Sequence, residues 1–394
     1  MISALDIGIL GLIILTAGPL WGFVIVGLGR IHRACRVKPH GDGLPQPPVD
    51  IIVPVKGGFS EHKQTLGSLL TQTYSDYEVI FILESLEDPA NGVVDELCAS
   101  SERARKIISG HRALCAQKNH NLVAGIKHVR RETKILVFCD SNNGTAPDWL
   151  ERFTRPLREG AVEAVTTFRA FHPEPETLGG VCQAIYAAFV LLLALYKPKP
   201  WGGATGILRS TFERLNVAEA WSRTVVDDLI LGNLLEEAGV KLYLDPSSLL
   251  ISPVKNQTVQ GFLTYLDRQI LFPKWTNPGI WFQTLLAHMI LTVTLIMTIV
   301  VALLHPFGYF SLLCAWAAYG FLGSFFVVAF LLHGVNPLRI SLFRWYITVI
   351  PCILIVGFVF LRSIFRKYID WHGTRYWPGK AGIVVRAEYL EPRL

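Results

Sequence analysis

Charged residues are distributed unevenly along this chain, and the gaps between them predict membrane helices. Four stretches contain no Asp, Glu, Lys or Arg, at residues 7–29, 281–304, 306–332 and 345–361. A helix needs about 20 apolar residues to cross the hydrocarbon core of a bilayer, so the first three stretches are long enough and the fourth is marginal. The pattern predicts an integral membrane protein with an N-terminal anchor and a C-terminal membrane region.

The segment between these two regions has the pattern of a globular α/β domain. Short β-branched runs predict strands at 49–55, 77–83, 134–139 and 161–168. Amphipathic stretches predict helices at 60–72, 117–130, 148–159 and 227–238. Strands that alternate with helices favour a mainly parallel sheet, which binds its ligand at the carboxyl ends of the strands.

Two further apolar segments need separate interpretation. Residues 178–196 carry no charge, so hydropathy alone would make them a span. A crossing there would put Asp140 and Asp228 on opposite sides of the membrane, so we interpret the segment as a buried or interfacial helix. Residues 261–275 mix aromatic, leucine and charged residues just before a span, which is typical of a helix lying in the membrane interface.

These patterns divide the chain into an anchor, a globular domain and a membrane region with a basic tail. The predicted parts are the anchor with its basic flank at 1–38, the α/β domain at 39–260, an interfacial helix at 261–279, the C-terminal membrane region at 280–361 and the tail at 362–394. Arg30, Arg33, Arg36 and Lys38 follow the anchor. The positive-inside rule therefore puts this flank and the following domain in the cytoplasm.

Composition narrows the class of protein further. The chain is 51% hydrophobic and only 17% charged, which excludes a disordered chain, a collagen and a small disulfide scaffold. The seven cysteines show no metal-binding spacing. The net charge of +6 is modest and lies largely beside the membrane, so we expect contact with a lipid bilayer and no nucleic-acid partner.

Carboxylates stand where such a sheet would display its chemistry. Glu84 ends the second predicted strand, Asp140 ends the third, and Asp227 and Asp228 open a helix. Any one of them alone is more often a helix cap or a solvated loop acid. Together they suit sugar transfer from a nucleotide diphosphate, because a carboxylate-held Mg²⁺ or Mn²⁺ neutralises the leaving group and a second carboxylate takes the proton of the acceptor hydroxyl. Direct displacement of this kind inverts the anomeric centre.

The chain resembles the membrane-bound glycosyltransferases of the GT-A fold, specifically the ceramide glucosyltransferase family. The motifs that carry the likeness are IIVPVKG at 51–57, YEVIFILESLEDPA at 77–90, KNHNL at 118–122, VFCDSNN at 137–143, GGATGILR at 202–209, VVDDLILGNLL at 225–235 and WHGTRY at 371–376. No single motif is specific, but their order and spacing together are. The resemblance implies an α/β domain with a Rossmann-like mixed sheet on the cytosolic side, joined to transmembrane helices.

The resemblance also implies roles for individual residues. Asp228 would be the catalytic base and Asp140 would hold the metal and diphosphate. The implied donor-binding residues are Lys56, Glu84, Asp88, Lys118 and Asn121, and the implied acceptor-side residues are Gly203, Asp227 and Trp275. We therefore expect Asp88, Asp140 and Asp228 to converge in one pocket beside the lipid head groups.

Two family motifs are incomplete in this sequence. Asn142 stands where the family often has a second metal-binding acid. The family's (Gln/Arg)-x-x-Arg-Trp motif is incomplete in either of two alignments. An alignment that begins at Arg268 lacks the final Arg and Trp of the motif. An alignment that ends at Lys274 and Trp275 lacks the first residue of the motif. Both cations are kept as donor-binding candidates, although Lys274 also suits an ordinary interfacial anchor.

The topology of the tail is ambiguous by charge and hydropathy alone. Four crossings that begin outside would leave the tail outside, whereas its excess of Lys and Arg favours the cytoplasm. Pro351, inside the short stretch at 345–361, also permits a re-entrant or interfacial element. We favour a cytoplasmic tail, because WHGTRY resembles a family element.

The function implied by the resemblance is inverting transfer of glucose from UDP-glucose to the primary hydroxyl of ceramide at the cytosolic membrane face, with Mg²⁺ or Mn²⁺. The membrane would be a bacterial inner membrane or a eukaryotic Golgi or endoplasmic-reticulum membrane. One alternative keeps the fold and changes the acceptor to a hopanoid, polyprenyl phosphate or diacylglycerol, or uses another UDP-sugar. A processive polysaccharide synthase and a catalytically inactive membrane adaptor are the further alternatives.

Overall fold

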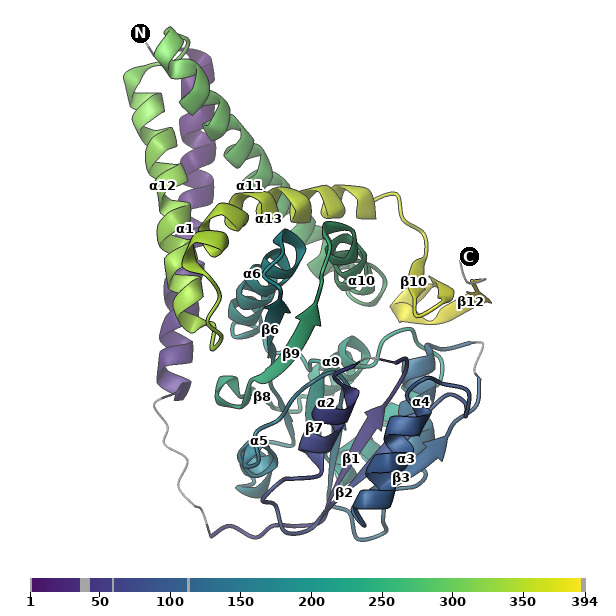
Figure 1. The fold of residues 1–394 in the computed structure, drawn as a ribbon. Coiled ribbons are helices and arrows are strands. Elements are labelled where there is room, and N and C mark those ends of the chain that lie inside the picture. The colour runs from purple at the N-terminus through teal and green to yellow at the C-terminus, as the bar shows by residue number, and fades with distance from the viewer. Residues whose placement is uncertain (1, 36–42, 59, 112–113, 391–394) are drawn as a thin grey trace.

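A sheet-based domain is joined to a group of long apolar helices (Figure 1). This computed structural model describes residues 2–35, 43–58, 60–111 and 114–390. The described residues leave out Arg36 and Lys38 of the predicted basic flank. They also leave out the predicted domain boundary between residues 38 and 39.

The core of the domain is a seven-stranded mixed sheet in which one strand runs against its neighbours. In spatial order the strands are β3 (Ala104–Ile108), β2 (Tyr77–Leu83), β1 (Val49–Pro54), β4 (Ile135–Cys139), β7 (Ala204–Leu208), β5 (Ala164–Thr166) and β8 (Leu242–Leu244). Strand β7 is antiparallel to β4 and β5, and the other pairs are parallel. The predicted α/β class with a mainly parallel sheet is confirmed.

Helices cover both faces of this sheet because the strands are hydrophobic on both sides. One face carries α2 (His62–Leu69), α3 (Asn91–Ser100) and α5 (Trp149–Arg158). The other carries α4 (Gln117–Ile126), α7 (Arg209–Arg214), α8 (Val217–Trp221) and α9 (Asp228–Glu237). In β1, Ile51 packs in the first layer and Ile52 in the second, as the two-residue period of a strand requires.

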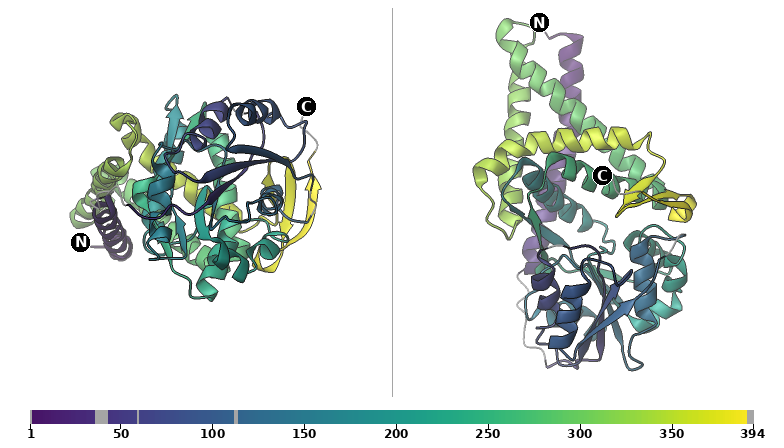
Figure 2. Two further views of the ribbon diagram at one scale, coloured as in Figure 1. Left: turned by 90° about the horizontal axis from the view of Figure 1, so that it is seen from below. Right: turned by 45° about the vertical axis from the view of Figure 1, so that its right-hand side comes forward.

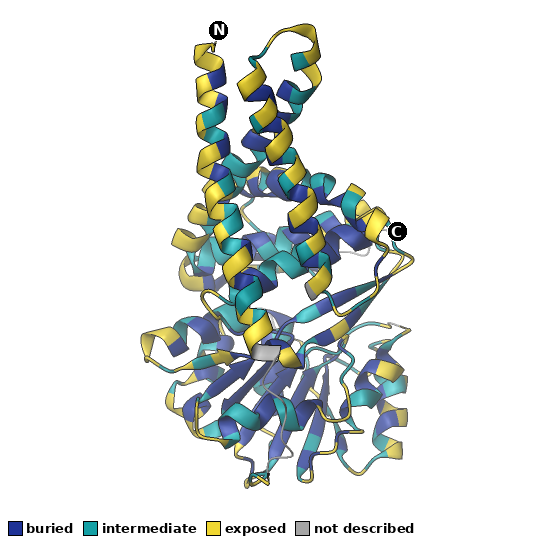
Figure 3. Ribbon diagram, turned by 90° about the vertical axis from the view of Figure 1, so that its left-hand side faces the viewer, coloured by how far each residue is buried: buried dark blue, intermediate teal, exposed yellow. Residues whose placement is uncertain are grey.

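Helix α1 (Ala4–Cys35), α11 (Pro278–Leu304) and α12 (Leu312–Val335) extend together away from the domain (Figure 1). Their outer faces expose large apolar side chains, including Ile14, Phe307 beyond the end of α11, and Trp316. Figure 3 shows exposed residues all along the protruding helices. Exposed apolar surface of this extent fits contact with lipid.

The fourth apolar helix has a different direction. Helix α13 (Leu342–Ser363) is long and apolar enough to span a membrane, but it lies crosswise to α1, α11 and α12 in two views (Figures 1 and 2). It contains Pro351 and packs on α6 and α10. With α1, α11 and α12 as the crossings and α13 in the plane of the membrane, the tail would lie on the same side as the α/β domain, as the charge of the tail favours.

Helices α6 (Leu178–Ala194) and α10 (Val259–Thr276) form a layer between the sheet and the membrane helices (Figure 1). Helix α6 contacts α1, α10, α12 and α13, so the charge-free segment at 178–196 forms a helix buried among other elements and not a separate span. The parallel pair β6 (Arg169–Glu174) and β9 (Leu250–Lys255) connects this layer to the sheet.

The tail forms a small antiparallel sheet that returns to the domain. Its strands are β10 (Ile369–Trp371), β11 (Thr374–Pro378) and β12 (Val384–Tyr389). Backbone hydrogen bonds join it to the segment before α9: Val225 donates to Gly382 O over 3.0 Å and Val384 donates to Arg223 O over 2.9 Å. The tail therefore forms one wall of the space above the sheet.

Candidate active site

A cavity of about 290 Å³ lies at the carboxyl ends of β1 and β4, between the sheet, α10 and the tail. Residues from all three parts of the chain line it. The predicted site residues on its wall are Lys56, Lys118, Asn121, Asp140, Gly203, Asp227, Asp228 and Arg268. The elements that bring them together are far apart in the sequence, so the cavity exists only in the folded chain.

The sheet order explains why the strand-end residues meet. Strand β1 lies between β2 and β4 and is parallel to both. Lys56, Glu84 and Asp140 follow the carboxyl ends of these three strands, so they emerge at one edge of the sheet. Strand β7 begins at this same edge because it is antiparallel to β4, and it brings Gly203 beside Asp140, whose backbone N donates to Gly203 O over 3.0 Å.

Lys118 stands between the acidic groups of the cavity. Its Nζ lies 2.9 Å from Asp140 Oδ1 and 3.1 Å from Asp227 Oδ2, and it donates to Gly202 O over 2.8 Å. Burial lowers the pKa of this ammonium, but the charges of Asp140, Asp227 and Asp228 outweigh it and raise the pKa above its ordinary value. Lys118 therefore stays charged and holds the acids in place.

Asp228 is the first residue of α9, and both of its carboxylate oxygens are held by backbone. Oδ2 accepts from Gly202 N over 2.9 Å and Oδ1 accepts from Leu229 N over 2.6 Å. Burial, followed by the charge of Asp227, raises the pKa of Asp228 to about 7. A carboxylate with this pKa can take a proton near neutral pH, which an ordinary aspartate does poorly.

The turn at Gly202 and Gly203 lies beneath the ring of Trp201. A Cβ on Gly203 would come within 2.0 Å of that ring, so only glycine fits. The Asn143 amide also donates to Gly203 O over 3.1 Å. This packing fixes the turn that connects the Asp140 loop to Asp228.

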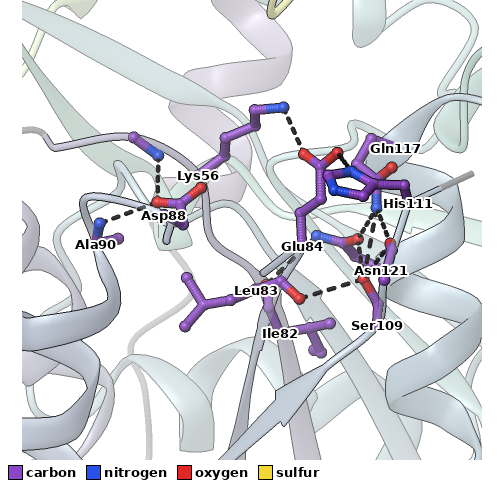
Figure 4. A network of polar contacts seen from close by, with 12 residues as sticks. Lys56, Ile82, Leu83, Glu84, Asp88, Ala90, Ser109, His111, Gln117 and Asn121 are labelled. Carbon is purple, nitrogen blue, oxygen red and sulfur yellow. Dashed lines mark hydrogen bonds and ion pairs between the residues drawn. The ribbon is translucent and has the colours of Figure 1, made fainter. Parts of the chain in front are cut away.

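A second polar network lies beside the cavity, next to Lys56 (Figure 4). Lys56 Nζ lies 2.6 Å from Glu84 Oε2, and His111 contacts the other oxygen of Glu84. Burial opposes ionisation of Glu84, but the hydrogen bonds from Lys56 and His111 lower its pKa. Asp88 Oδ1 accepts from the backbone N of Gly57 and of Ala90, each over 2.9 Å, which ties Asp88 to the turn that carries Lys56.

Arg268 extends from α10 into the cavity, together with Gln269 and Phe272. Its guanidinium lies 5.9 Å from the ring centre of Trp371, and its buried Nε has no hydrogen-bond partner among the described residues. Burial and the nearby charge of Arg169 lower the pKa of Arg268. The geometry therefore brings the register that begins at Arg268 to the cavity.

A comparison with known protein families identifies the family of this chain. The sequence model of glycosyl transferase family 21 matches residues 15–382. The chain belongs to this family. Among solved structures, the chain is similar to the mannosyltransferase PcManGT from Pyrobaculum calidifontis in complex with GDP-Man and Mn²⁺, with 16% identity, a TM-score of 0.50, and coverage of 91% of this chain and 99% of that one. That likeness supports the GT-A fold. No curated protein matches the chain.

Four predicted site residues of this family 21 protein lie outside the described cavity wall. Glu84 and Asp88 belong to the adjoining network, where they position the Lys56 turn. Asp88 is not among the residues that line the cavity, so the expectation that it shares one pocket with Asp140 and Asp228 stays a prediction. Lys274 and Trp275 lie further along α10, and Trp275 packs beside the core between α9 and the tail.

Lys274 caps a helix. Its Nζ donates to the backbone oxygens of Ser363, Ile364 and Arg366, over 2.7, 3.0 and 2.7 Å, at the end of α13. These contacts lie at the end of α13, and Lys274 is not among the residues that line the cavity. The structure therefore favours Lys274 as a helix cap over the predicted donor-binding role.

Replacing Lys274 with Met should therefore affect stability and not donor binding. Loss of three charge-assisted hydrogen bonds at a helix C-terminus should lower the free energy of unfolding by about 1–3 kcal/mol. Thermal unfolding of the detergent-solubilised enzyme measures this, with Lys63→Met at an exposed position as the control. A large rise in the KM for the donor with an unchanged melting temperature would return Lys274 to the site.

Sequence reasoning missed several residues that line the cavity. They are Gln117, Arg169, Trp201, Trp371, His372 and Tyr376. The WHGTRY resemblance pointed to the tail but not to a place in the fold, and Arg169 and Trp201 lie in segments without any motif. His372 adopts a left-handed backbone conformation with φ of 47°, and burial together with the charges of Arg268 and Lys56 lowers its pKa to about 4, so its imidazole is neutral near pH 7.

Proposed function

We propose that this family 21 enzyme transfers glucose from UDP-glucose to the primary hydroxyl of ceramide and inverts the anomeric centre. The observation that carries the proposal is the position of Asp228. Its carboxylate, with a pKa of about 7, lines one cavity with Asp140 and Lys118, beneath the helices that face the membrane. Family membership supports sugar transfer, and this site supplies the groups that the reaction needs.

The proposed step is a direct displacement at the anomeric carbon. Asp228 accepts the proton of the acceptor hydroxyl as its oxygen forms the new bond to that carbon, and the bond to the diphosphate oxygen breaks on the opposite side. The backbone hydrogen bonds from Gly202 and Leu229 fix the carboxylate, so it needs no reorientation during the reaction. A single base and a single displacement give inversion.

Positive groups in the same cavity favour the charge that develops on the nucleotide diphosphate. Arg268 has no carboxylate partner among the described residues and offers a planar pair of donors to phosphate oxygens. Lys118 and Lys56 are cations already positioned by carboxylates. We propose that these three residues bind the diphosphate and that Asn121 and the Glu84 network support the nucleotide side.

The acids of the cavity are compatible with a divalent cation held mainly by the donor. No group of three His, Cys, Asp or Glu side chains among the described residues forms a metal site. Asp140 and Asn142 both line the cavity and present oxygens to it. Mg²⁺ is commonly held by one or two carboxylates plus substrate phosphates and water, so we propose Asp140, supported by Asn142, as the protein ligands. When bound, Mg²⁺ or Mn²⁺ would neutralise charge on the leaving diphosphate.

The membrane layer supports a lipid acceptor on the cytosolic side. Helices α6, α10 and α13 lie between the cavity and the protruding helices (Figure 1). A lipid in this layer keeps its tails in the bilayer while its hydroxyl reaches the cavity. The basic residues after α1 and in the tail favour the cytoplasm for the domain.

The activity should depend on pH through Asp228. The residue acts as a base only when ionised, so kcat/KM should rise with pH through a limb near 7, the pKa of Asp228. Asp227→Asn removes the neighbouring negative charge and should move this limb to lower pH. A profile from about pH 5 to pH 9 measured for both enzymes tests this; a limb that stays in place in the variant would contradict the assignment.

Product analysis tests the proposed substrates. The purified enzyme is incubated with labelled UDP-sugars and a panel containing ceramide, a hopanoid, a polyprenyl phosphate and diacylglycerol, with and without a chelator. We expect glucosylceramide from UDP-glucose and ceramide, and its loss with the chelator. A product on another lipid or from another UDP-sugar would contradict the proposed substrates but would still support sugar transfer to a lipid. Absence of both transfer and donor hydrolysis would favour an inactive adaptor.

A further inference from the structure

Arg169, the first residue of β6, extends into the cavity between aromatic rings from three parts of the chain. Its guanidinium carbon lies 4.5 Å from the ring centre of Phe171, 5.1 Å from that of Trp201 and 5.8 Å from that of Tyr265. Rings of this kind attract the flat faces of a guanidinium and leave the N–H groups at its edge free to donate. Arg169 is thus held in place without using its hydrogen-bond donors.

Arg169 has no carboxylate partner in the described part of the chain. Both lysines of the cavity do: Lys56 pairs with Glu84, and Lys118 pairs with Asp140 and Asp227. Arg169 is half-buried and shares the cavity with the cation of Arg268, and neither guanidinium has a carboxylate partner among the described residues. This excess of positive charge in the cavity fits a ligand that supplies oxygen atoms to the guanidinium of Arg169.

The position of Trp201 indicates which substrate this ligand is. The ring of Trp201 packs against Gly203, and its centre lies 5.1 Å from the guanidinium carbon of Arg169. The neighbouring Gly202 donates to Asp228, the proposed base. Through Trp201, Arg169 is therefore linked to the side of the cavity near Asp228, where the acceptor hydroxyl must lie. Lys56 and the Glu84 network, which we assign to the donor, lie elsewhere, at the ends of β1 and β2.

The same residue also faces the lipid layer. Tyr265, which stacks near Arg169, belongs to α10 and makes an edge contact with Tyr186 of α6, with ring centres 6.3 Å apart. Phe171 contacts Tyr265 in the same way, at 5.6 Å. These rings pack in the apolar core of α6 and α10, which reaches the guanidinium of Arg169 at the cavity. A molecule with an apolar body and a polar head matches this change of polarity.

We propose that Arg169 is the head-group residue of the acceptor site: it donates hydrogen bonds to oxygen atoms next to the reacting hydroxyl, with Trp201 as the wall that orients them. This inference rests on the proposed function. In ceramide the matching oxygen is that of the amide carbonyl, three bonds from the carbon that bears the hydroxymethyl group. Arg169 is a positioning residue, because it sets where the hydroxyl lies relative to Asp228 without taking part in proton transfer.

The test separates acceptor binding from donor binding in the full-length enzyme in nanodiscs. Arg169→Gln should raise the KM for ceramide about tenfold, which corresponds to loss of one charge-assisted hydrogen bond, and leave the KM for UDP-glucose unchanged. Arg169→Lys should fall between Gln and wild type, because a lysine keeps the charge but not the planar pair of donors. Arg223→Gln is the matched control, at an exposed position whose side chain pairs with Glu219 alone among the described residues.

A second measurement needs no acceptor. UDP release from UDP-glucose by hydrolysis alone should be equal in wild type and Arg169→Gln. A lower hydrolysis rate or a raised KM for UDP-glucose in the variant would show that Arg169 serves the donor and would overturn the inference, as would an unchanged KM for the acceptor. If the wild type glycosylates a different lipid, the proposed function fails in its substrate, and the acceptor KM is then measured with that lipid.

Discussion

Asp228→Asn should lower kcat by about 10²–10⁴-fold, the contribution of a general base. The amide keeps the shape of the carboxylate and one acceptor for the backbone donors Gly202 and Leu229, but it cannot take a proton. The KM for UDP-glucose should change little, because the base faces the acceptor. Initial rates of glycolipid formation, with radiolabelled donor, measure the loss.

One control variant and the melting temperature separate loss of the base from loss of the fold. Asp148→Asn removes an exposed carboxylate that pairs with Arg152 within α5 and its N-cap, and it should keep full activity. Asp228→Asn should lower the melting temperature only slightly, because the amide keeps one of the two backbone hydrogen bonds and removal of a carboxylate with a raised pKa leaves no unpaired charge. A variant that transfers glucose at near the wild-type rate would show that Asp228 is not the base.

Lys118→Met is the second change with a large expected effect. It removes the cation that lies within about 3 Å of two carboxylates and is influenced by a third. Buried carboxylates left without their partner cost about 3–5 kcal/mol of stability. Activity should also fall below detection, since the acids lose their arrangement and the diphosphate loses a cation.

A double variant distinguishes the two effects of Lys118→Met. Adding Asp227→Asn removes one of the unpaired charges and should recover much of the melting temperature. Activity should remain absent, because the cation for the diphosphate is still missing. Recovery of both stability and activity in the double variant would show that Lys118 serves only to balance charge.

The sequence was sufficient to predict most of the sheet and many of the residues that line the cavity. Strand β2 has the predicted bounds Tyr77–Leu83, because an uninterrupted buried run has no other role in a parallel sheet. The acid at the end of β4 could be placed for the same reason: parallel strands deliver their last residues to one edge. Edge strand β3, ARKII, was missed because its two basic residues hide the alternation of a strand.

The remaining features could not be predicted because they depend on contacts between residues far apart in the sequence. Nothing local distinguishes Arg268 from Lys274, which are both cations on α10; only the end of α13, which Lys274 caps, separates their roles. The direction of α13 was ambiguous for a similar reason. Its composition suits a span, and its crosswise position follows from packing on α6 and α10. Arg169 carries no motif, and its aromatic neighbours come from separate elements.

The anomeric configuration of the product tests the account most directly. UDP-glucose has an α-linked sugar, and a single displacement with Asp228 as the base must give a β-linked lipid. Nuclear magnetic resonance of the glycolipid made by the purified enzyme should show the β-anomer alone. An α-linked product would contradict direct displacement and the role of Asp228 in it.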